Sequence, residues 1–369
     1  MRLAEVEQGL EELFPLHLAE SGDPVGRQLG RGDQTIKRLM LTIDATESVV
    51  EEAIAAQVDL LLAYHPVLSH PPKRWNGDDP DVRPLTRAAA HEMAIWSPHT
   101  AFDAVPGGVA DWLVGPFGSG RPLRPAVATG AADRKVTVFV PPENQEAVRS
   151  AMAEAGAGAI GAYRECSFST SGLGTFRGLP GTSPAIGKPG QLESVEEHQL
   201  EMVCTQQKLP AVLAALRLAH PYEETPFDIT SLILPPQADA GAGRVVTLSN
   251  GQSLSQLAAT TREHLGVEGV EVAEAAGAPE KHQVLAACPG SGADLIPQAA
   301  AAGATVFLTG EMRHHEQLQA LRNGMSLILA GHTNTQRGAL KPLTEQLQKF
   351  FPTLNIQRAT RDRHPLRRM

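Results

Sequence analysis

The sequence predicts an α/β protein in which a two-part α/β domain is interrupted by a ferredoxin-like α+β insert. Over residues 1–128, apolar segments typical of buried strands alternate with helical segments, which indicates a parallel sheet covered by helices. The pattern changes over residues 129–240, where two strand-helix units occur together with additional strands. The first pattern then resumes over residues 241–369. Two similar stretches that flank a different one are typical of a single domain with an insertion.

The first section contains the elements of a parallel α/β sheet. The expected order is strand, helix, strand, helix and strand, at residues 38–46, 48–57, 58–66, 84–92 and 93–99. Asp44 and Glu47 form a pair typical of a helix start. Residues 114–133 are rich in glycine and proline, which indicates a boundary between domains.

The middle section repeats a strand-helix unit twice. Residues 135–140 are expected to form a strand, and Pro141 and Pro142 stand at the start of the following helix, where proline is favoured. A second unit covers residues 198–220, and residues 225–234 supply a last strand. The stretch CSFSTSGLGTFRGLPG, residues 166–181, is expected to form a hairpin. The third section returns to strands and helices in alternation.

Composition limits the possible functions. Hydrophobic residues make up 42% and charged residues 20% of the 369 residues, as in ordinary globular proteins. The net charge of −9 argues against nucleic acid as a partner, and basic residues cluster only in the tail at 358–369, expected to be a solvated end. Three cysteines without paired spacing indicate a reducing compartment. Without a signal peptide or a run of about 18 apolar residues, we expect a cytoplasmic protein with no membrane partner.

Histidines follow three of the expected strands. His65, His99 and His332 each come directly after an apolar segment. Because the carboxyl ends of parallel strands face the ligand crevice of an α/β sheet, these imidazoles are expected in one region. Asp103 lies four residues after His99, and Gln336 four after His332, a spacing that places each pair on one side of a helical turn. Imidazole nitrogens and one carboxylate are suitable donors for a divalent cation of the zinc, iron or manganese class.

Spacing alone leaves other interpretations open. A single histidine after a strand is more often a capping or surface residue than a metal ligand. The segment CPGSGADL, residues 288–295, similarly fits either a tight turn or an anion site at a helix N-terminus.

Five segments resemble the signature segments of a known family. They are DATESVVEEAI, LLAYHPVL, HTAFDAVPGGVADWL, CPGSGADLI and LAGHTNTQRGAL. The chain is thereby identified as similar to the dinuclear-metal-centre hexamer family, the Ngg-one-interacting-factor-three-like proteins or GTP cyclohydrolase I type 2 homologs. The middle section resembles the PII-like and CutA-like insert of its longer members. The resemblance covers nearly the whole chain in order, and it implies a homohexamer.

The resemblance also implies a paired metal site. Matched residue by residue, the family's histidine pair falls on Tyr64 and His65, its aspartate on Asp103, and its final His-x-x-x-Glu on His332 and Gln336. Two positions depart from the family pattern. Tyr64 stands where the first histidine would, and Gln336 stands where the bridging glutamate would.

These departures weaken a paired site on physical grounds. Two dications about 3.5 Å apart repel each other by roughly 19 kcal/mol at an effective dielectric constant near 20, so anionic ligands must offset the repulsion. Asp103 is the only matched anion, because Gln336 offers a neutral oxygen and Tyr64 a phenol. We therefore expect at most one tightly bound divalent ion per chain, held by His65 and Asp103 with His332 or His99 completing the site. Gln336 would contribute at most its carbonyl oxygen, and Tyr64 would line the site.

Two hypotheses for function remain. The first is a metal-dependent hydrolase that acts on a nucleotide or phosphate ester through a metal-activated water. The second is a non-enzymatic hexameric scaffold or regulatory protein with a degenerate metal site, in which the insert serves as the interaction module. The sequence does not decide between an enzyme and a non-enzyme, and it leaves the partner open as a small molecule or a protein.

Overall fold

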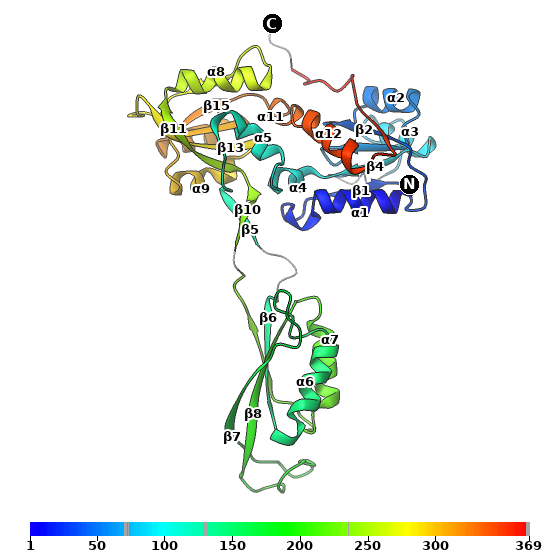
Figure 1. Cartoon of the computed structure of the whole chain (residues 1–369), viewed down its shortest axis with the longest axis vertical. Coiled ribbons are helices and arrows are strands. Elements are labelled where there is room, and N and C mark those ends of the chain that lie inside the picture. Colours follow the sequence, from blue (N-terminus) through cyan, green and yellow to red (C-terminus); the bar gives the residue numbers. More distant parts are fainter. Residues whose placement is uncertain (70–71, 73, 128–131, 235, 367–369) are drawn as a thin grey trace. The chain divides into compact units, whose positions relative to one another are not determined.

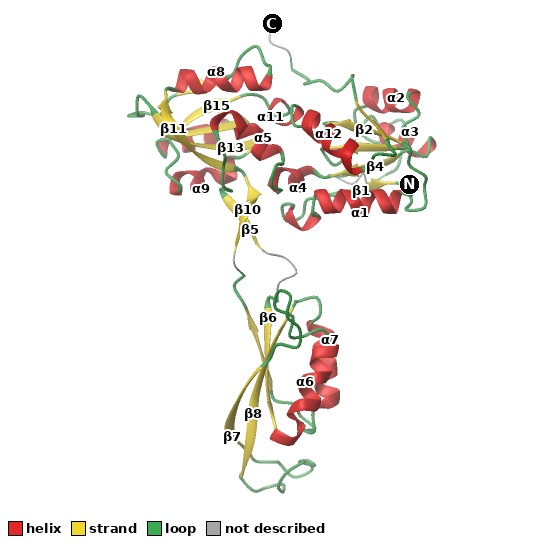
Figure 2. Cartoon of the chain, in the orientation of Figure 1, coloured by secondary structure: helices red, strands yellow, loops and turns green. Residues whose placement is uncertain are grey.

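The computed structural model describes residues 1–69, 72, 74–127, 132–234 and 236–366 (Figure 1). The chain forms two compact units, one of Met1–Ala126 with Gln237–Met369 and one of Val127–Pro236. Helices and strands are mixed throughout, so the predicted α/β class is confirmed (Figure 2). The predicted limits of the insert were 129 and 240, and residues 128–131 and 235 near these limits lie outside the described residues. Within the described ranges, no helix has the length and apolar character needed to cross a membrane.

The first sheet of the larger unit has five strands in the order β1-β4-β3-β2-β16. The strands are β1 (Gly26–Leu29), β2 (Arg38–Thr42), β3 (Leu60–Ala63), β4 (Ala94–Ser97) and β16 (Asn355–Arg358). β16, β2, β3 and β4 are parallel, and β1 pairs antiparallel with β4. Because β16 comes from the C-terminal section and completes a sheet of the N-terminal section, both sections contribute to one unit.

Helices cover both faces of this sheet, which explains why its strands are apolar on both sides. They are α1 (Leu3–Leu13), α2 (Glu47–Ala55), α3 (Arg83–Ala90) and α12 (Leu340–Phe350). Alternate residues of β2 point to opposite faces. Leu39 and Leu41 pack with α1 and α12, whereas Met40 packs with α2 and α3.

The second sheet has the order β11-β13-β14-β15-β12. The strands are β11 (Arg244–Gln252), β12 (Glu271–Ala273), β13 (His282–Ser291), β14 (Val306–Glu311) and β15 (Ser326–Leu329). The three central strands are parallel and the two edge strands antiparallel. The helices α5 (Val109–Val114) and α8 (Leu254–Leu265) cover one face, and α9 (Ile296–Ala301) and α10 (His314–Arg322) cover the other. The N-terminal section thus supplies α5 to the second sheet.

Short elements complete the larger unit. Helix α4 (His99–Ala104) follows β4, and α11 (Asn334–Arg337) follows β15. Strand β5 (Arg124–Val127) pairs with β10 (Pro236–Ala242) in a two-stranded sheet. Three short 3-10 helices are η1 (Leu16–Leu18), η2 (Gly115–Phe117) and η4 (Ala293–Leu295).

The smaller unit has the order β-α-β-β-α-β, with an antiparallel sheet of order β7-β8-β6-β9. Its elements are β6 (Arg134–Val140), η3 (Pro142–Asn144), α6 (Gln145–Glu154), β7 (Phe168–Phe176), β8 (Glu193–Cys204), α7 (Leu209–Ala219) and β9 (Phe227–Ser231). Both helices pack on one face, where Val138 and Leu200 meet Val148 and Leu216.

The hairpin expected within residues 166–181 is wrong. Within this stretch, Phe168–Phe176 form the single strand β7, whose partner along its full length is β8, beginning at Glu193. The stretch contains several glycines and serines, but the chain reverses only in the longer loop after Phe176. The tertiary pairing of two long strands therefore decides where the turn lies.

Candidate functional site

Three imidazoles come together from the two sheets of the larger unit. His65 follows β3, His99 begins α4 after β4, and His332 lies between β15 and α11. The ring centroids of His65 and His99 are 5.4 Å apart, and those of His65 and His332 are 5.5 Å apart. His65 is thus the central member of the group.

A carboxylate holds the Nδ1 atom of each of these rings. The Nδ1–oxygen distances are 2.7 Å from His65 to Asp44, 2.8 Å from His99 to Asp23 and 2.9 Å from His332 to Glu311. An ionised carboxylate only accepts hydrogen bonds, so each Nδ1 carries a proton and donates it. The Nε2 atoms have no hydrogen bond among the described residues, and in the neutral ring each presents a lone pair. This orientation by an outer carboxylate is typical of metal-binding histidines.

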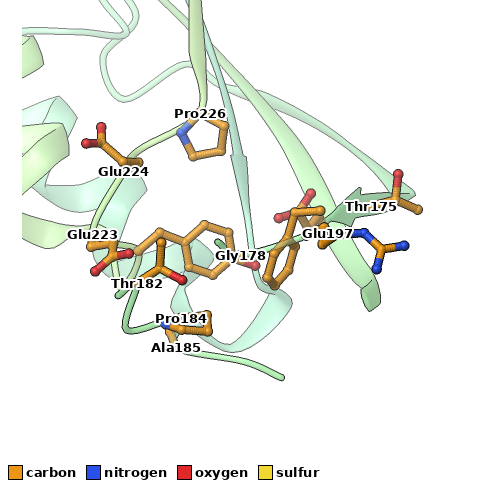
Figure 3. Close-up of a pocket in the computed structure, with 12 residues that line it drawn as sticks. Thr175, Gly178, Thr182, Pro184, Ala185, Glu197, Glu223, Glu224 and Pro226 are labelled. Atoms are coloured by element: carbon orange, nitrogen blue, oxygen red, sulfur yellow. The ribbon is translucent and has the colours of Figure 1, made fainter. Parts of the chain in front are cut away.

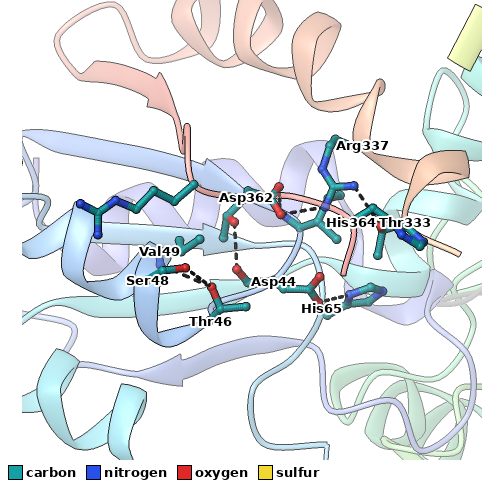
Figure 4. Close-up of polar contacts among 12 residues, drawn as sticks. Asp44, Thr46, Ser48, Val49, His65, Thr333, Arg337, Asp362 and His364 are labelled. Atoms are coloured by element: carbon teal, nitrogen blue, oxygen red, sulfur yellow. Dashed lines mark hydrogen bonds and ion pairs between the residues drawn. The ribbon is translucent and has the colours of Figure 1, made fainter. Parts of the chain in front are cut away.

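Asp44 takes a role that the sequence interpretation had missed. It was expected to form a helix-start pair with Glu47, but Thr46 is the N-cap of α2 and accepts a hydrogen bond from the Val49 amide at 3.4 Å. Asp44 instead faces His65 (Figure 4). Burial alone would raise the pKa of Asp44, but the hydrogen bond and positive charge of His65 outweigh it, and the pKa lies below its ordinary value. Asp44 therefore stays ionised beside the imidazole.

The C-terminal tail also reaches this region, so the expectation of a solvated end at 358–369 is wrong for Asp362, while residues 367–369 lie outside the described residues. The Asp362 side chain is only 6% exposed and accepts hydrogen bonds from the Ile43 amide at 2.9 Å and from Arg337 Nη2 at 2.8 Å. Arg337 also donates to the hydroxyl of Thr333 (Figure 4). Asp362 thus links the end of β2 to α11. A single acidic residue in a basic tail was the only sequence signal for it.

Tyr64, Asp103 and Gln336 form a buried hydrogen-bonded group. The Tyr64 side chain is almost fully buried, and its hydroxyl donates to Asp103 Oδ1 at 2.5 Å. Gln336 Nε2 donates to the Tyr64 hydroxyl at a long 3.4 Å, and Gln336 Oε1 is buried without a hydrogen-bond partner in the described part of the chain. Burial raises the pKa of Asp103 to about 7 and that of Tyr64 well above its usual range. The Tyr64 hydroxyl therefore occupies Oδ1 of Asp103, the only carboxylate at a position that matches a family ligand.

Residues 288–295, expected to form a tight turn or an anion site, comprise the end of β13, whose pairing with β14 shifts register between Cys288 and Ser291, and the 3-10 helix η4. Gly290 has a φ of +65°, and a Cβ atom there would lie 2.7 Å from Gln336 Nε2 and 3.0 Å from His332 Nε2. Only glycine allows this approach. The Gly290 amide donates to the hydroxyl of Thr335 at 2.8 Å, so it is not free to bind an anion.

A cavity of about 250 Å³ lies beside Asp103 and Cys288. Its charged lining consists of Glu20, Asp103, Asp294 and Arg124, and the arginine forms ion pairs with Glu20 and Asp294. Burial and the Asp103 carboxylate raise the pKa of the Cys288 thiol well above its ordinary value. The thiol therefore stays protonated and is a poor nucleophile.

A larger cavity, of about 710 Å³, lies beside His332. Glu268, Glu271 and Glu311 line it together with His364, and no lysine or arginine does among the residues that the structure describes. This wall attracts cations and repels polyanions such as phosphates.

The donors fit one metal ion better than two. Two imidazoles on a tetrahedral ion at about 2.0–2.1 Å have ring centroids roughly 5 Å apart, close to the spacing of His65 from His99 and His332. Asp103 already accepts a hydrogen bond from the Tyr64 hydroxyl, and Gln336 is uncharged. These two positions therefore provide little negative charge for a second ion. Among the described residues, no three His, Cys, Asp or Glu side chains already surround a common point. A third donor must therefore move to complete a site.

Known proteins resemble this chain over almost all of its length. The family model described as Duf34/NIF3 (NGG1p interacting factor 3) matches residues 1–365. A Bacillus subtilis protein named "GTP cyclohydrolase 1 type 2 homolog" is 36% identical over 89% of this chain and 87% of its own length. One of the same name from Mycobacterium tuberculosis is 37% identical over 95% and 92%. The crystal structure of a Bacillus cereus protein related to NIF3 has a TM-score of 0.67 at 30% identity, covering 100% of this chain and 99% of that one.

Proposed function

Because the chain belongs to the Duf34/NIF3 family, we propose that it is a metal-binding protein with a one-ion site centred on His65. The observation that carries this proposal is the set of three imidazoles whose Nδ1 atoms donate to carboxylates and whose Nε2 atoms form no hydrogen bond with the described residues. Because the carboxylates already fix the rings, the histidine side chains lose less conformational entropy when they bind an ion.

His65 supplies the central nitrogen, and His332 or His99 supplies the second. Asp103 supplies the anionic oxygen once it separates from the Tyr64 hydroxyl, and the unpartnered Gln336 Oε1 is available as a neutral oxygen. Imidazole with carboxylate oxygen suits zinc, iron and manganese. A second ion would find no further anion among the matched residues.

The test is metal content per chain in protein purified without a histidine tag, with titration calorimetry using Zn²⁺ and Mn²⁺. We expect at most one tightly bound ion. His65→Ala should abolish tight binding, whereas His315→Ala, at a side chain that is 73% exposed, should not. Tyr64→His together with Gln336→Glu should raise the content towards two. Two equivalents in the unmodified protein, or full binding by His65→Ala, would contradict the one-ion site.

As the activity of this site we propose hydrolysis of a nucleotide or phosphate ester. A bound divalent ion lowers the pKa of a coordinated water and so supplies a nucleophile near neutral pH. The names of the relatives support this class of reaction. The acidic cavity beside His332 favours the second candidate, a non-enzymatic metal-binding scaffold, because it disfavours polyanionic substrates. Nucleotide hydrolysis by metal-loaded protein that His65→Ala abolishes would select the enzyme, and its absence would select the scaffold.

For the assembly we propose a homohexamer. Family membership supports this proposal. Light scattering coupled to gel filtration at micromolar concentration should give six times the chain mass of 39.3 kDa. A monomer would contradict it.

A further inference from the structure

The smaller unit contains a pocket that the proposed metal function does not use. Its volume is about 320 Å³, and it lies at the end of β7, against β8 and the segment after α7 (Figure 3). Two aromatic side chains, Phe176 and Tyr222, line it together with polar groups. The volume is at the lower end of the range for small-molecule sites.

The charges in this pocket are mostly negative. Three carboxylates line it, those of Glu197, Glu223 and Glu224, against the single guanidinium of Arg177. None of these carboxylates has an ion-pair partner within the described ranges of the chain. Arg177 donates to a backbone carbonyl, that of Gly190, at 2.7 Å. The pocket therefore carries an excess of uncompensated negative charge, which favours a cation.

The loop after β7 closes one side of the pocket and is held in place. Both carboxylate oxygens of Glu223 accept from the Ser183 amide at 3.2 Å. The Gly190 amide donates to the Gly178 carbonyl at 2.7 Å. Figure 3 shows Glu223 and Glu197 on opposite sides of the pocket, so Glu197 remains as a carboxylate that the loop does not use.

The Tyr222 hydroxyl is buried beside the Glu197 carboxylate, and it forms no well-aligned hydrogen bond with any described residue. Burial, together with the neighbouring Glu197 carboxylate, raises its pKa above the ordinary range, so it stays a neutral phenol. A buried hydroxyl without a well-aligned partner destabilises the protein, and a polar ligand that bonds to it would relieve this cost. The rings of Phe176 and Tyr222 have centroids 6.4 Å apart and offer aromatic faces to a cation.

We propose that this pocket binds a small organic cation, an amine or guanidinium compound. Its charged group is held by Glu197 and by the faces of Phe176 and Tyr222, and the Tyr222 hydroxyl donates to or accepts from the ligand. The lining residues include no histidine or cysteine, which distinguishes the pocket from a transition-metal site. The smaller unit is then a ligand-binding module in its own right.

Titration calorimetry on the full chain tests the proposal, with agmatine and spermidine as cationic probes and ATP and inorganic phosphate as anionic ones. We expect saturable binding of at least one cation and of neither anion. Glu197→Gln should weaken the cation's affinity by about tenfold or more, because it removes a charge-assisted contact. Tyr222→Phe should weaken it by a smaller factor.

The matched control is Glu196→Gln, the neighbouring exposed carboxylate on β8, whose side chain points to the opposite face of the strand. It should leave the affinity unchanged. Circular dichroism of each variant separates lost folding from lost binding, and Tyr222→Phe carries the test if Glu197→Gln does not fold. Failure of both cations to bind, equal losses in Glu196→Gln and Glu197→Gln, or anion binding that Arg177→Gln abolishes would overturn the proposal.

Discussion

Arg244 is a fully buried arginine that joins the two halves of the larger unit, and its replacement is the most informative stability test. Its Nε donates to Asp111 Oδ1 at 2.6 Å and its Nη2 to Asp111 Oδ2 at 2.9 Å, a bidentate pair. It also donates to the carbonyls of Gly241 and Gly243 at 2.7 and 2.8 Å. Its Nη2 also donates to the carbonyls of Ala104 and Val105 at 3.3 and 3.4 Å, at the end of α4, the helix that carries the predicted ligand aspartate.

Arg244→Met should destabilise the larger unit by about 3 kcal/mol. Removing one partner of a buried ion pair typically lowers the free energy of unfolding by about 3–5 kcal/mol, because the other charge is left unpaired. The Asp111 side chain is 27% exposed, so water compensates part of its charge and the lower end of the range applies. Replacing both partners in Arg244→Met/Asp111→Leu should recover part of the loss, since no unpaired charge remains.

Denaturant unfolding followed by tryptophan fluorescence measures this effect in one unit alone. The three tryptophans, Trp75, Trp96 and Trp112, all lie in the unit formed by Met1–Ala126 and Gln237–Met369. Arg262→Met, at an exposed arginine of α8, is the matched control and should change the free energy of unfolding by less than about 0.5 kcal/mol. A loss below about 1 kcal/mol for Arg244→Met, or a double variant no more stable than the single one, would refute the reasoning.

Two further predictions use the same fluorescence signal. Asp362→Asn removes the negative charge that accepts hydrogen bonds from the Ile43 amide and from Arg337. It should lower the free energy of unfolding by about 1–3 kcal/mol. An unchanged free energy of unfolding would show that these contacts of the tail do not stabilise the fold. Burial lowers the pKa of His264 although its ring donates to the Trp112 carbonyl, so its neutral form is favoured in the fold. The contribution of neutral His264 to the free energy of unfolding is complete when the pH is above its unfolded-state pKa near 6.5. It is lost as the pH falls through the lower pKa of the folded state. His264→Gln should therefore flatten the decline in stability as the pH falls below the unfolded pKa near 6.5, and an identical decline in both proteins would contradict the assignment.

The sequence by itself determined the class of fold and the family. Long apolar runs such as Leu60–Ala63 form strands buried on both faces, because hydrophobic periodicity is a local property of the chain. Motifs that cover nearly its full length predicted the family, and the comparisons confirmed it. The sequence also placed His65 and His99 after strands, so their convergence followed from the direction of parallel strands.

Only the tertiary structure decided which charged groups meet. The partners of His99 and of the Ile43 amide lie 76 and 319 residues away along the chain, at Asp23 and Asp362. No local pattern marks such pairs, because a hydrogen bond depends on a separation of about 3 Å that the packing of whole sheets and helices sets. Local sequence places each side chain on an element, and the assembly of those elements in three dimensions selects its partner.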